Sequence, residues 1–268
     1  MREVIGMKYA FMSFSAPQLS LDELLDAARQ YGYDGIEPRI DSGHAHGVEV
    51  DASPADRSAI RRKAEESGIA ICCVATSCKY ADPATAKQEV EKALRCVDLA
   101  ADVGSPRLRV FGGQIPEGVS REEAVDLLVA SLSLIAVHAE PCGVTVCLET
   151  HDHWCNPEHV VEVMQQVDDD SIAVNWDIMH PVRNGHTMDE AFEALRPWIR
   201  HVHFHDGVTV EGKLSLVPIG QGAIDHRRAV ELLQAAGYDG YLSGEWINWE
   251  PYEVHLPREL ATMKEYEG

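Results

Sequence analysis

The chain has 268 residues, of which 44 are acidic and 23 basic, so its formal net charge at pH 7 is −21. Such an acidic chain repels phosphate backbones, which argues against a nucleic-acid partner, and no apolar run approaches the ~18 residues of a membrane helix. The N-terminal residues lack the basic-then-apolar pattern of a secretory signal. Seven cysteines without such a signal indicate reduced thiols, packed mainly in the core, and a cytoplasmic protein.

Eight short apolar runs with strand character recur along the chain, separated by amphipathic stretches of helical period. The runs cover residues 9–14, 35–38, 70–75, 107–111, 144–149, 173–177, 201–205 and 241–245. Four helix starts fit a capping box, with Ser or Thr three residues before Glu or Gln, and two more have a cap residue followed by Pro. The capping-box residues are Ser20, Thr85, Ser120 and Thr187, and the cap–Pro pairs begin at Ser53 and Asn156.

Strands that alternate with helices predict a parallel sheet of the α/β class. Eight such units in this length, without a long linker, predict one domain over residues 1–268, a single (β/α)8 TIM barrel. The alternative is an open, doubly wound sheet. The absence of Gly-x-Gly-x-x-Gly after the first strand weakens a nucleotide-binding version of it.

Each of the last four predicted strands ends in a side chain that can bind a metal, namely Glu149, Asp177, His203 and Glu245. The active site of a barrel lies at the carboxyl ends of its strands, so these four side chains are expected to converge. The first three follow one another at 28 and 26 residues, close to one βα unit of about 30. The longer interval before Glu245 is assigned to a loop over residues 206–222.

Three carboxylates and one imidazole make a donor set dominated by hard oxygen atoms. It suits one divalent metal ion, with Mn²⁺ the first choice and Mg²⁺, Co²⁺, Fe²⁺ or Zn²⁺ also compatible. The alternative is that these are ordinary polar residues that cap the ends of strands.

Several segments resemble the xylose isomerase-like barrel superfamily of sugar isomerases, sugar epimerases and inosose dehydratases. They are Leu148-Glu149-Thr-His, Asn175-Trp-Asp177-Ile-Met-His180, Arg200-His-Val-His203-Phe-His-Asp206, Pro218-Ile-Gly-Gln-Gly222-Ala-Ile-Asp225 and Gly244-Glu245-Trp. The resemblance implies that Glu149, Asp177, His203 and Glu245 bind one divalent metal. It also implies that Glu149 and Glu245 act as the acid–base pair and that His180 contacts a hydroxyl group of the substrate.

Five further residues are candidates for the substrate pocket. Glu37 ends the second strand, where it is expected to hold substrate or form an internal ion pair, and Arg109 is expected to reach an anionic group or neutralise the ligand carboxylates. His151 follows Glu149 and is expected to line the pocket. His205 stands where related dehydratases often have Lys. Trp246 is expected to form an apolar wall against a sugar ring or to pack in the core.

The expected function is a metal-dependent sugar isomerase or epimerase that removes a proton next to a carbonyl and passes through an enediolate. Its partner would be a small sugar or polyol, with no nucleic acid and no membrane, and a homo-oligomer is compatible with the sequence. The ketose epimerases have an Arg shortly after the metal-binding His, and residues 206–210 contain none, so a dehydratase or lyase acting on a keto-sugar or cyclitol is a close alternative. More distant alternatives are an apurinic endonuclease and a barrel subunit without catalytic activity.

Overall fold

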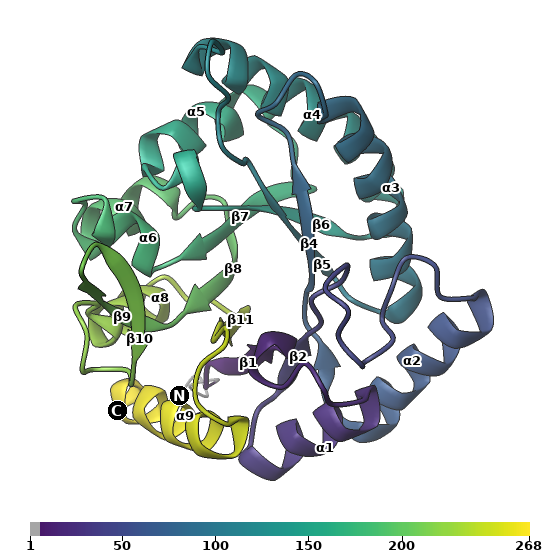
Figure 1. Ribbon diagram of the computed structural model, residues 1–268, viewed down its shortest axis with the longest axis vertical. Helices are drawn as coiled ribbons and strands as arrows, with labels where there is room; N and C mark the ends of the chain where they lie inside the picture. Colours follow the sequence, from purple (N-terminus) through teal and green to yellow (C-terminus); the bar gives the residue numbers. More distant parts are fainter. Residues whose placement is uncertain (1–5) are drawn as a thin grey trace.

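A computed structural model describes residues 6–268, which form a ring of parallel strands surrounded by helices (Figure 1). The nine-stranded sheet has the order β3-β2-β1-β11-β8-β7-β6-β5-β4. Its strands are β1 (Lys8–Met12), β2 (Gly35–Glu37), β3 (Ala70–Ile71), β4 (Val74–Lys79), β5 (Arg107–Phe111), β6 (Thr145–Glu149), β7 (Ile172–Asp177), β8 (Ile199–Phe204) and β11 (Tyr241–Gly244). The architecture confirms the predicted TIM barrel of the α/β class.

Nine α-helices, counted over residues 6–268, lie outside the sheet. They are α1 (Leu21–Tyr31), α2 (Pro54–Ser67), α3 (Ala86–Val103), α4 (Arg121–Cys142), α5 (Pro157–Val167), α6 (Met179–Arg183), α7 (Met188–Leu195), α8 (His226–Ala235) and α9 (Tyr252–Glu267). The apolar faces of the strands pack against them, as where the Trp176 ring of β7 lies 5.6 Å from the Phe192 ring of α7.

Helix α4 is long and apolar enough to cross a membrane by length and composition alone. In the structure it is one of the outer helices of the barrel, with Leu128, Leu132 and Ile135 fully buried in the core. Burial of these side chains accounts for part of its apolar character, whereas Leu134 and Val137 of the same helix are exposed.

The structure splits the predicted third strand into two. Strand β3 pairs with β2, whereas β4 pairs with β5, and Cys72 and Cys73 lie between them. The wall closes at an isolated bridge between Arg39 and Ala75, where the Ile40 amide donates to the Ala75 carbonyl at 3.0 Å. The barrel is therefore nearly closed, and at this seam, between the segment after β2 and β4, one bridge joins the strands.

The predicted helix caps are confirmed at five of six positions. Ser20, Ser120 and Thr187 form complete capping boxes, and Ser53 and Asn156 accept amide hydrogen bonds at the first turns of α2 and α5.

The prediction for Thr85 is wrong, because its side chain makes no capping hydrogen bond at the start of α3. The carboxylate of Asp82 instead accepts a hydrogen bond from the Ala84 amide at 2.9 Å. The local turn is therefore held by an aspartate that lies three residues before the predicted cap.

The predicted loop over residues 206–222 contains an antiparallel hairpin, which corrects that part of the assignment (Figure 1). Strands β9 (Asp206–Val210) and β10 (Lys213–Val217) are joined by Glu211 and Gly212, which both have positive φ. A two-residue turn of this kind matches the twist of a hairpin. The alternating apolar residues on either side of Glu-Gly were the sequence signal for it.

Asp206 explains the glycine-rich segment that follows the hairpin. Its buried carboxylate accepts hydrogen bonds from the amides of Gly207, Gly220, Gly222 and Ile224 at 2.8–3.3 Å. A Cβ atom at Gly222 would lie 2.0 Å from Oδ1 of Asp206, so only glycine fits there. One buried charge therefore fixes the connection from β10 to α8.

The Asp206→Asn variant is expected to lower the free energy of unfolding by about 2 kcal/mol, because the amide group presents N–H donors to backbone N–H donors. Urea denaturation measures this loss. Glu211→Gln, at the exposed hairpin turn, is the control and should change the free energy by less than about 0.5 kcal/mol. Equal stability of Asp206→Asn and the wild type would contradict the role of this carboxylate.

Candidate metal centre

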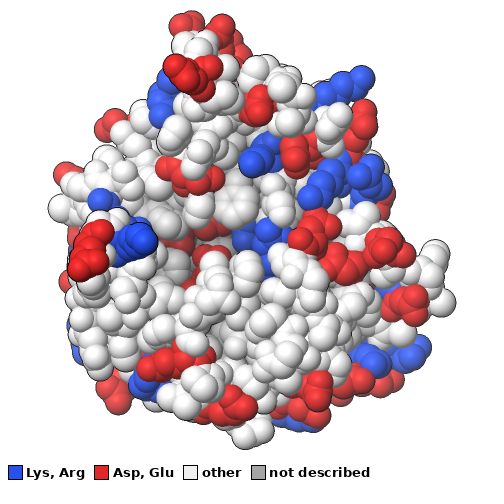
Figure 2. Space-filling model, in the orientation of Figure 1, with Lys and Arg blue, Asp and Glu red and all other residues white. Residues whose placement is uncertain are grey.

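Glu149, Asp177, His203 and Glu245 converge at the carboxyl ends of β6, β7, β8 and β11. One ligand atom from each lies within 4.8 Å of the others, and all four residues are buried. The space-filling view shows acidic side chains inside a central hollow on this face, next to basic ones (Figure 2). The sequence prediction thus selected four residues that the fold brings to one point.

Three carboxylate oxygens of this cluster form ion pairs but no hydrogen bonds among the described residues. Both carboxylate oxygens of Glu149 and Oδ2 of Asp177 are buried without a hydrogen-bond partner among the described residues. Arg109 Nε lies 3.0 Å from Glu149 Oε2, and His205 Nε2 lies 3.1 Å from Asp177 Oδ2, as ion pairs outside hydrogen-bond geometry. Buried carboxylates are costly unless they are paired. These oxygens, which have no hydrogen-bond donor, therefore fit a divalent cation.

The backbone aims the carboxylate of Asp177 at the centre. Its Oδ1 atom accepts the amides of Met179 at 2.8 Å and His180 at 3.2 Å, which belong to the first turn of α6. The hydroxyl of Thr150 accepts the Asp177 amide at 2.9 Å and donates to its carbonyl at 3.1 Å. These bonds fix one oxygen and leave Oδ2 for a ligand.

Glu37 holds the imidazole of His203 from behind. Its Oε1 lies 3.1 Å from His203 Nε2, and its Oε2 lies 2.8 Å from His201 Nε2. The other ring nitrogen of His203, Nδ1, faces the cluster, 3.5 Å from Glu149 Oε1 and 3.4 Å from Glu245 Oε2. A carboxylate behind a metal-binding histidine orients its ring and increases its basicity.

The electrostatics around Glu37 support a charged state. Burial alone would raise the pKa of Glu37. His203 and His201 outweigh this effect and bring the pKa well below its usual range. Burial likewise opposes charge on His203, yet Glu37 and Glu149 raise its pKa well above the ordinary value. The centre thus attracts positive charge.

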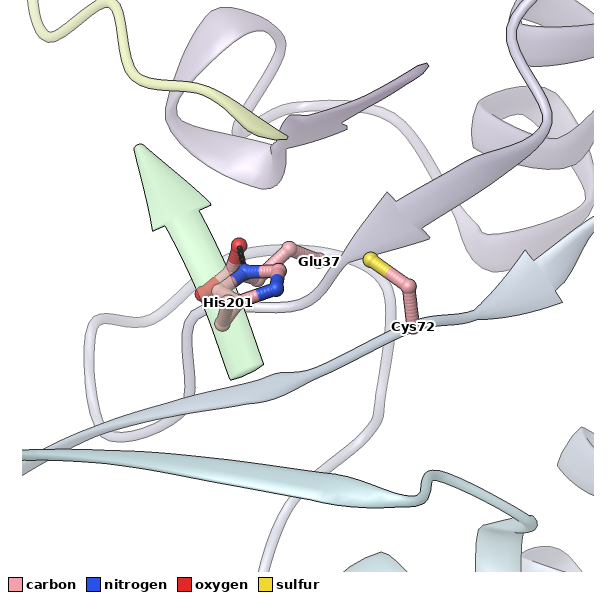
Figure 3. Close-up of side chains that lie close together, drawn as sticks. All are labelled: Glu37, Cys72 and His201. Atoms are coloured by element: carbon pink, nitrogen blue, oxygen red, sulfur yellow. Dashed lines mark hydrogen bonds and ion pairs between the residues drawn. The ribbon is translucent and has the colours of Figure 1, made fainter. Parts of the chain in front are cut away.

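Figure 3 shows Glu37 and His201 beside Cys72, a third group of potential metal ligands. The Cys72 thiol donates to the Ile36 carbonyl at 3.3 Å, and burial raises its pKa. Because both oxygens of Glu37 already face imidazoles, this group forms the hydrogen-bonded support behind the centre. Glu37, predicted to hold substrate or form an internal ion pair, lies in that support.

The other predicted pocket residues surround the carboxylates, with one exception. The rings of His151 and His180 lie 4.6 Å apart, and those of His180 and His205 lie 6.0 Å apart. Arg109 also donates to the Thr76 carbonyl at 2.7 Å. The exception is Trp246, whose ring contacts other aromatic residues.

Two of these histidines carry raised pKa values. Burial lowers the pKa of His205, but Asp177 raises it to about 9. Burial also opposes charge on His151, but Asp152 and Glu149 raise its pKa to about 9. Cationic imidazoles therefore line the rim of an acidic centre.

The ring of Trp246 is fully buried, 5.4 Å from the Phe204 ring and 5.1 Å from the His255 ring. This position agrees with the second expectation for Trp246, which is packing in the core.

Sequence analysis did not assign Asn175 to the site. Its Nδ2 lies 3.1 Å from His203 Nδ1 in the interior of the barrel. The signal was present, because Asn175 precedes Asp177 by two residues and so shares its strand face. Thr150 gave no comparable signal, since its contact with Asp177 joins neighbouring strands.

The loop after β2 contains a buried histidine, His46. His46 Nε2 lies 3.2 Å from the Arg39 carbonyl, and its Nδ1 accepts the Val48 amide at 3.0 Å. These two bonds fit a neutral ring that is protonated at Nε2. Burial accordingly lowers the pKa of His46 to about 4.

A family model described as "Xylose isomerase-like TIM barrel" matches residues 25–266. The chain belongs to this family. The membership confirms the resemblance seen in the sequence motifs, and it covers the N-terminal half as well as the segments that carry the four candidate ligands.

Proteins similar to this chain carry names that state different reactions. The 3-dehydroshikimate dehydratase of Bacillus anthracis is 23% identical over 96% of both chains. A structure of 3-keto-D-glucoside 4-epimerase from E. coli has a TM-score of 0.80 at 17% identity, covering 97% of this chain and 100% of that one. A structure of IOLI protein with a bound zinc atom has a TM-score of 0.80 at 20% identity, covering 97% and 96%. The structural matches show the shared fold.

Glu37→Gln is expected to weaken Mn²⁺ binding by about 10- to 100-fold, because the neutral amide no longer fixes the His203 ring. Isothermal titration of the metal-free protein with Mn²⁺ measures the change. Cys72→Ser, which alters the neighbouring residue of the same group, is the matched control and should bind as the wild type does. Unchanged affinity in Glu37→Gln would contradict the positioning role.

His46 is expected to make stability depend on pH. Above about pH 6.5 the ring is neutral in both states, whereas at lower pH the unfolded chain binds a proton that the folded ring refuses. Stability is therefore lost as the pH falls from about 6.5 to about 4. Relative to His46→Asn, whose oxygen can still accept the Val48 amide, the wild type should lose on the order of 2–3 kcal/mol over this interval. Urea titrations at several pH values measure this, and a constant difference would refute it.

Proposed function

We propose that this protein is a divalent-metal-dependent isomerase or epimerase that removes a proton next to the carbonyl of a small sugar or polyol derivative. The observation that carries the proposal is the convergence of three buried carboxylates and one imidazole within 4.8 Å. The family and its relatives support an enzyme acting on small sugar-like molecules.

Glu149, Asp177, His203 and Glu245 would hold the metal, with Mn²⁺ the first choice because of the oxygen-rich donor set. When bound, the metal would polarise the carbonyl group of the substrate and balance the charge that develops on its oxygen. The buried oxygens of Glu149 and Asp177 that lack a hydrogen-bond partner among the described residues are the observation that supports this fit.

Glu149 and Glu245 would move the protons. Both carboxylates lie about equally far from Nδ1 of His203, at 3.5 and 3.4 Å, so they flank one point from different strands. One would take the proton from the carbon next to the carbonyl, which leaves an enediolate, and the other would return a proton. Return to the opposite face of that carbon gives an epimer, and return to the neighbouring carbon gives an isomer.

The histidines at the rim would orient the substrate. His180 lies beside Asp177, with 3.8 Å between Nε2 and Oδ2, and its side chain remains partly exposed to the hollow. It is placed to hydrogen-bond a substrate hydroxyl, next to His151 and His205. Arg109 would hold the Glu149 carboxylate in place.

A dehydratase is the second candidate. The specific observation in its favour is the Bacillus anthracis 3-dehydroshikimate dehydratase, which aligns with this chain over nearly the full length of both. In such a reaction the same carboxylate removes the proton, and a hydroxyl on the next carbon leaves as water after protonation. His205 or His151 would be the nearby proton donors.

Solvent exchange separates the two candidates. The Mn²⁺-loaded protein is incubated in D₂O with a panel of ketoses, inososes, oxo-sugars and 3-dehydroshikimate. Deuterium at the carbon next to the carbonyl, with no loss of water, supports the isomerase or epimerase. Loss of water with a new conjugated double bond supports the dehydratase. Neither outcome on the whole panel, with one metal bound per chain, would count against proton abstraction.

Glu245→Gln is expected to lower kcat by about 10²- to 10⁴-fold, because the amide cannot accept or return a proton. Turnover of the responding substrate measures the loss, and circular dichroism confirms that the variant folds. Glu117→Gln, in the exposed loop after β5 at the same face, is the matched control with unchanged kcat. Near-wild-type turnover in Glu245→Gln would remove this residue from the mechanism.

A further inference from the structure

A second group of potential metal ligands lies on the outside of the barrel, away from the central carboxylates. Asp98 of α3 and His138 and Cys142 of α4 each offer a ligand atom within 4.8 Å of the other two. The two helices pack side by side on the rim of the ring (Figure 1). His138 and Cys142 are one turn apart, so they project from the same face of α4.

The three donors differ in chemistry, and together they suit a borderline-soft cation. A thiolate, an imidazole and a carboxylate are the ligands that Zn²⁺ takes in proteins, in a tetrahedral site whose fourth position can hold water. His138 Nε2 already lies 2.7 Å from Asp98 Oδ1. These two donors therefore point toward one another before any cation enters.

The ends of both helices provide an independent reason for a cation here. Carbonyl groups at the carboxyl end of a helix carry partial negative charge, which basic residues usually balance. Neither α3 nor α4 has a basic residue in its last turn, and α3 has Asp102 there. Arg57 pairs with Asp102 at 2.9 Å, whereas Asp98 pairs with His138 and, among the described residues, with no Arg or Lys.

The negative charges near Cys142 affect the pKa of its thiol. Partial burial raises its pKa, and the charges of Asp98 and Asp102 raise it further. A divalent cation would replace the thiol proton and be attracted by the same carboxylates. Cys142 is also the one cysteine of the seven that is not buried, so it can exchange ligands with solvent.

We propose that Asp98, His138 and Cys142 form a Zn²⁺ site that joins α3 to α4 on the outer surface of the barrel. The site shares no residue with the central cluster and does not depend on the proposed reaction. Binding there would tie two neighbouring outer helices together near their carboxyl ends and would mask the accessible thiol.

Alkylation of Cys142 tests the proposal, because this thiol is accessible while the other six are buried. The wild-type protein is treated with N-ethylmaleimide at pH 7 with and without micromolar Zn²⁺, and the peptide that contains Cys142 is quantified by mass spectrometry. Zn²⁺ is expected to slow its modification at least tenfold. Mg²⁺, which avoids thiolate ligands, is expected to give no protection.

Variants separate coordination from simple electrostatic attraction. Asp98→Asn and His138→Gln should lose the protection, since each removes a ligand. Asp102→Asn is the matched control, because it removes the same charge one turn away but leaves the three ligands. Asp177→Ala, which removes a central donor, should also keep the protection. Unchanged alkylation in the presence of Zn²⁺, or equal protection in His138→Gln, would overturn the site.

Discussion

The burial of several carboxylates around one point is the constraint on which the rest of this structure depends. Glu37, Glu149, Asp177 and Glu245 all lie inside the barrel, where like charges repel and water cannot screen them. The chain meets this demand with one guanidinium, from Arg109, and with imidazoles that lie against the acids. The oxygens that still lack a hydrogen-bond donor mark the candidate metal site, and the strands hold them there.

Orientation in the centre comes from contacts between segments that are distant along the chain. Glu37 reaches His201 and His203 from 164 and 166 residues away, and Asp177 is fixed by amides of the helix turn that follows it. Asp206 acts in a similar way at the hairpin, where its carboxylate accepts hydrogen bonds from the backbone amides of a glycine-rich segment. Buried acids thus organise both the candidate site and the loop beside it.

The strand ends and the four candidate ligands could be predicted because alternation, helix caps and the length of a βα unit are local signals. For Glu37 an internal ion pair was one of two expectations, but its partners His201 and His203 could not be predicted, since they depend on which side chains of β8 face the end of β2. The break between β3 and β4 also has no local signature, because Cys72 and Cys73 continue an apolar run. The hairpin was predictable from Glu211-Gly212, whereas Thr85 matched a cap pattern that the turn at Asp82 displaced.

The join between the end of β2 and β4 lies beside the residue that orients His203, so pairing of the strands there affects the candidate metal centre. Five residue pairs join β5 to β6, whereas β2 pairs with β3 at two positions and the segment after β2 meets β4 at the single bridge of Arg39 and Ala75. Glu37, the last residue of β2, stands next to this join. If thermal motion separated the end of β2 from β4, Glu37 would lose its contacts with the imidazoles of His201 and His203 while the other strands stayed paired. On heating, the proposed activity would then be lost below the temperature at which the barrel itself unfolds.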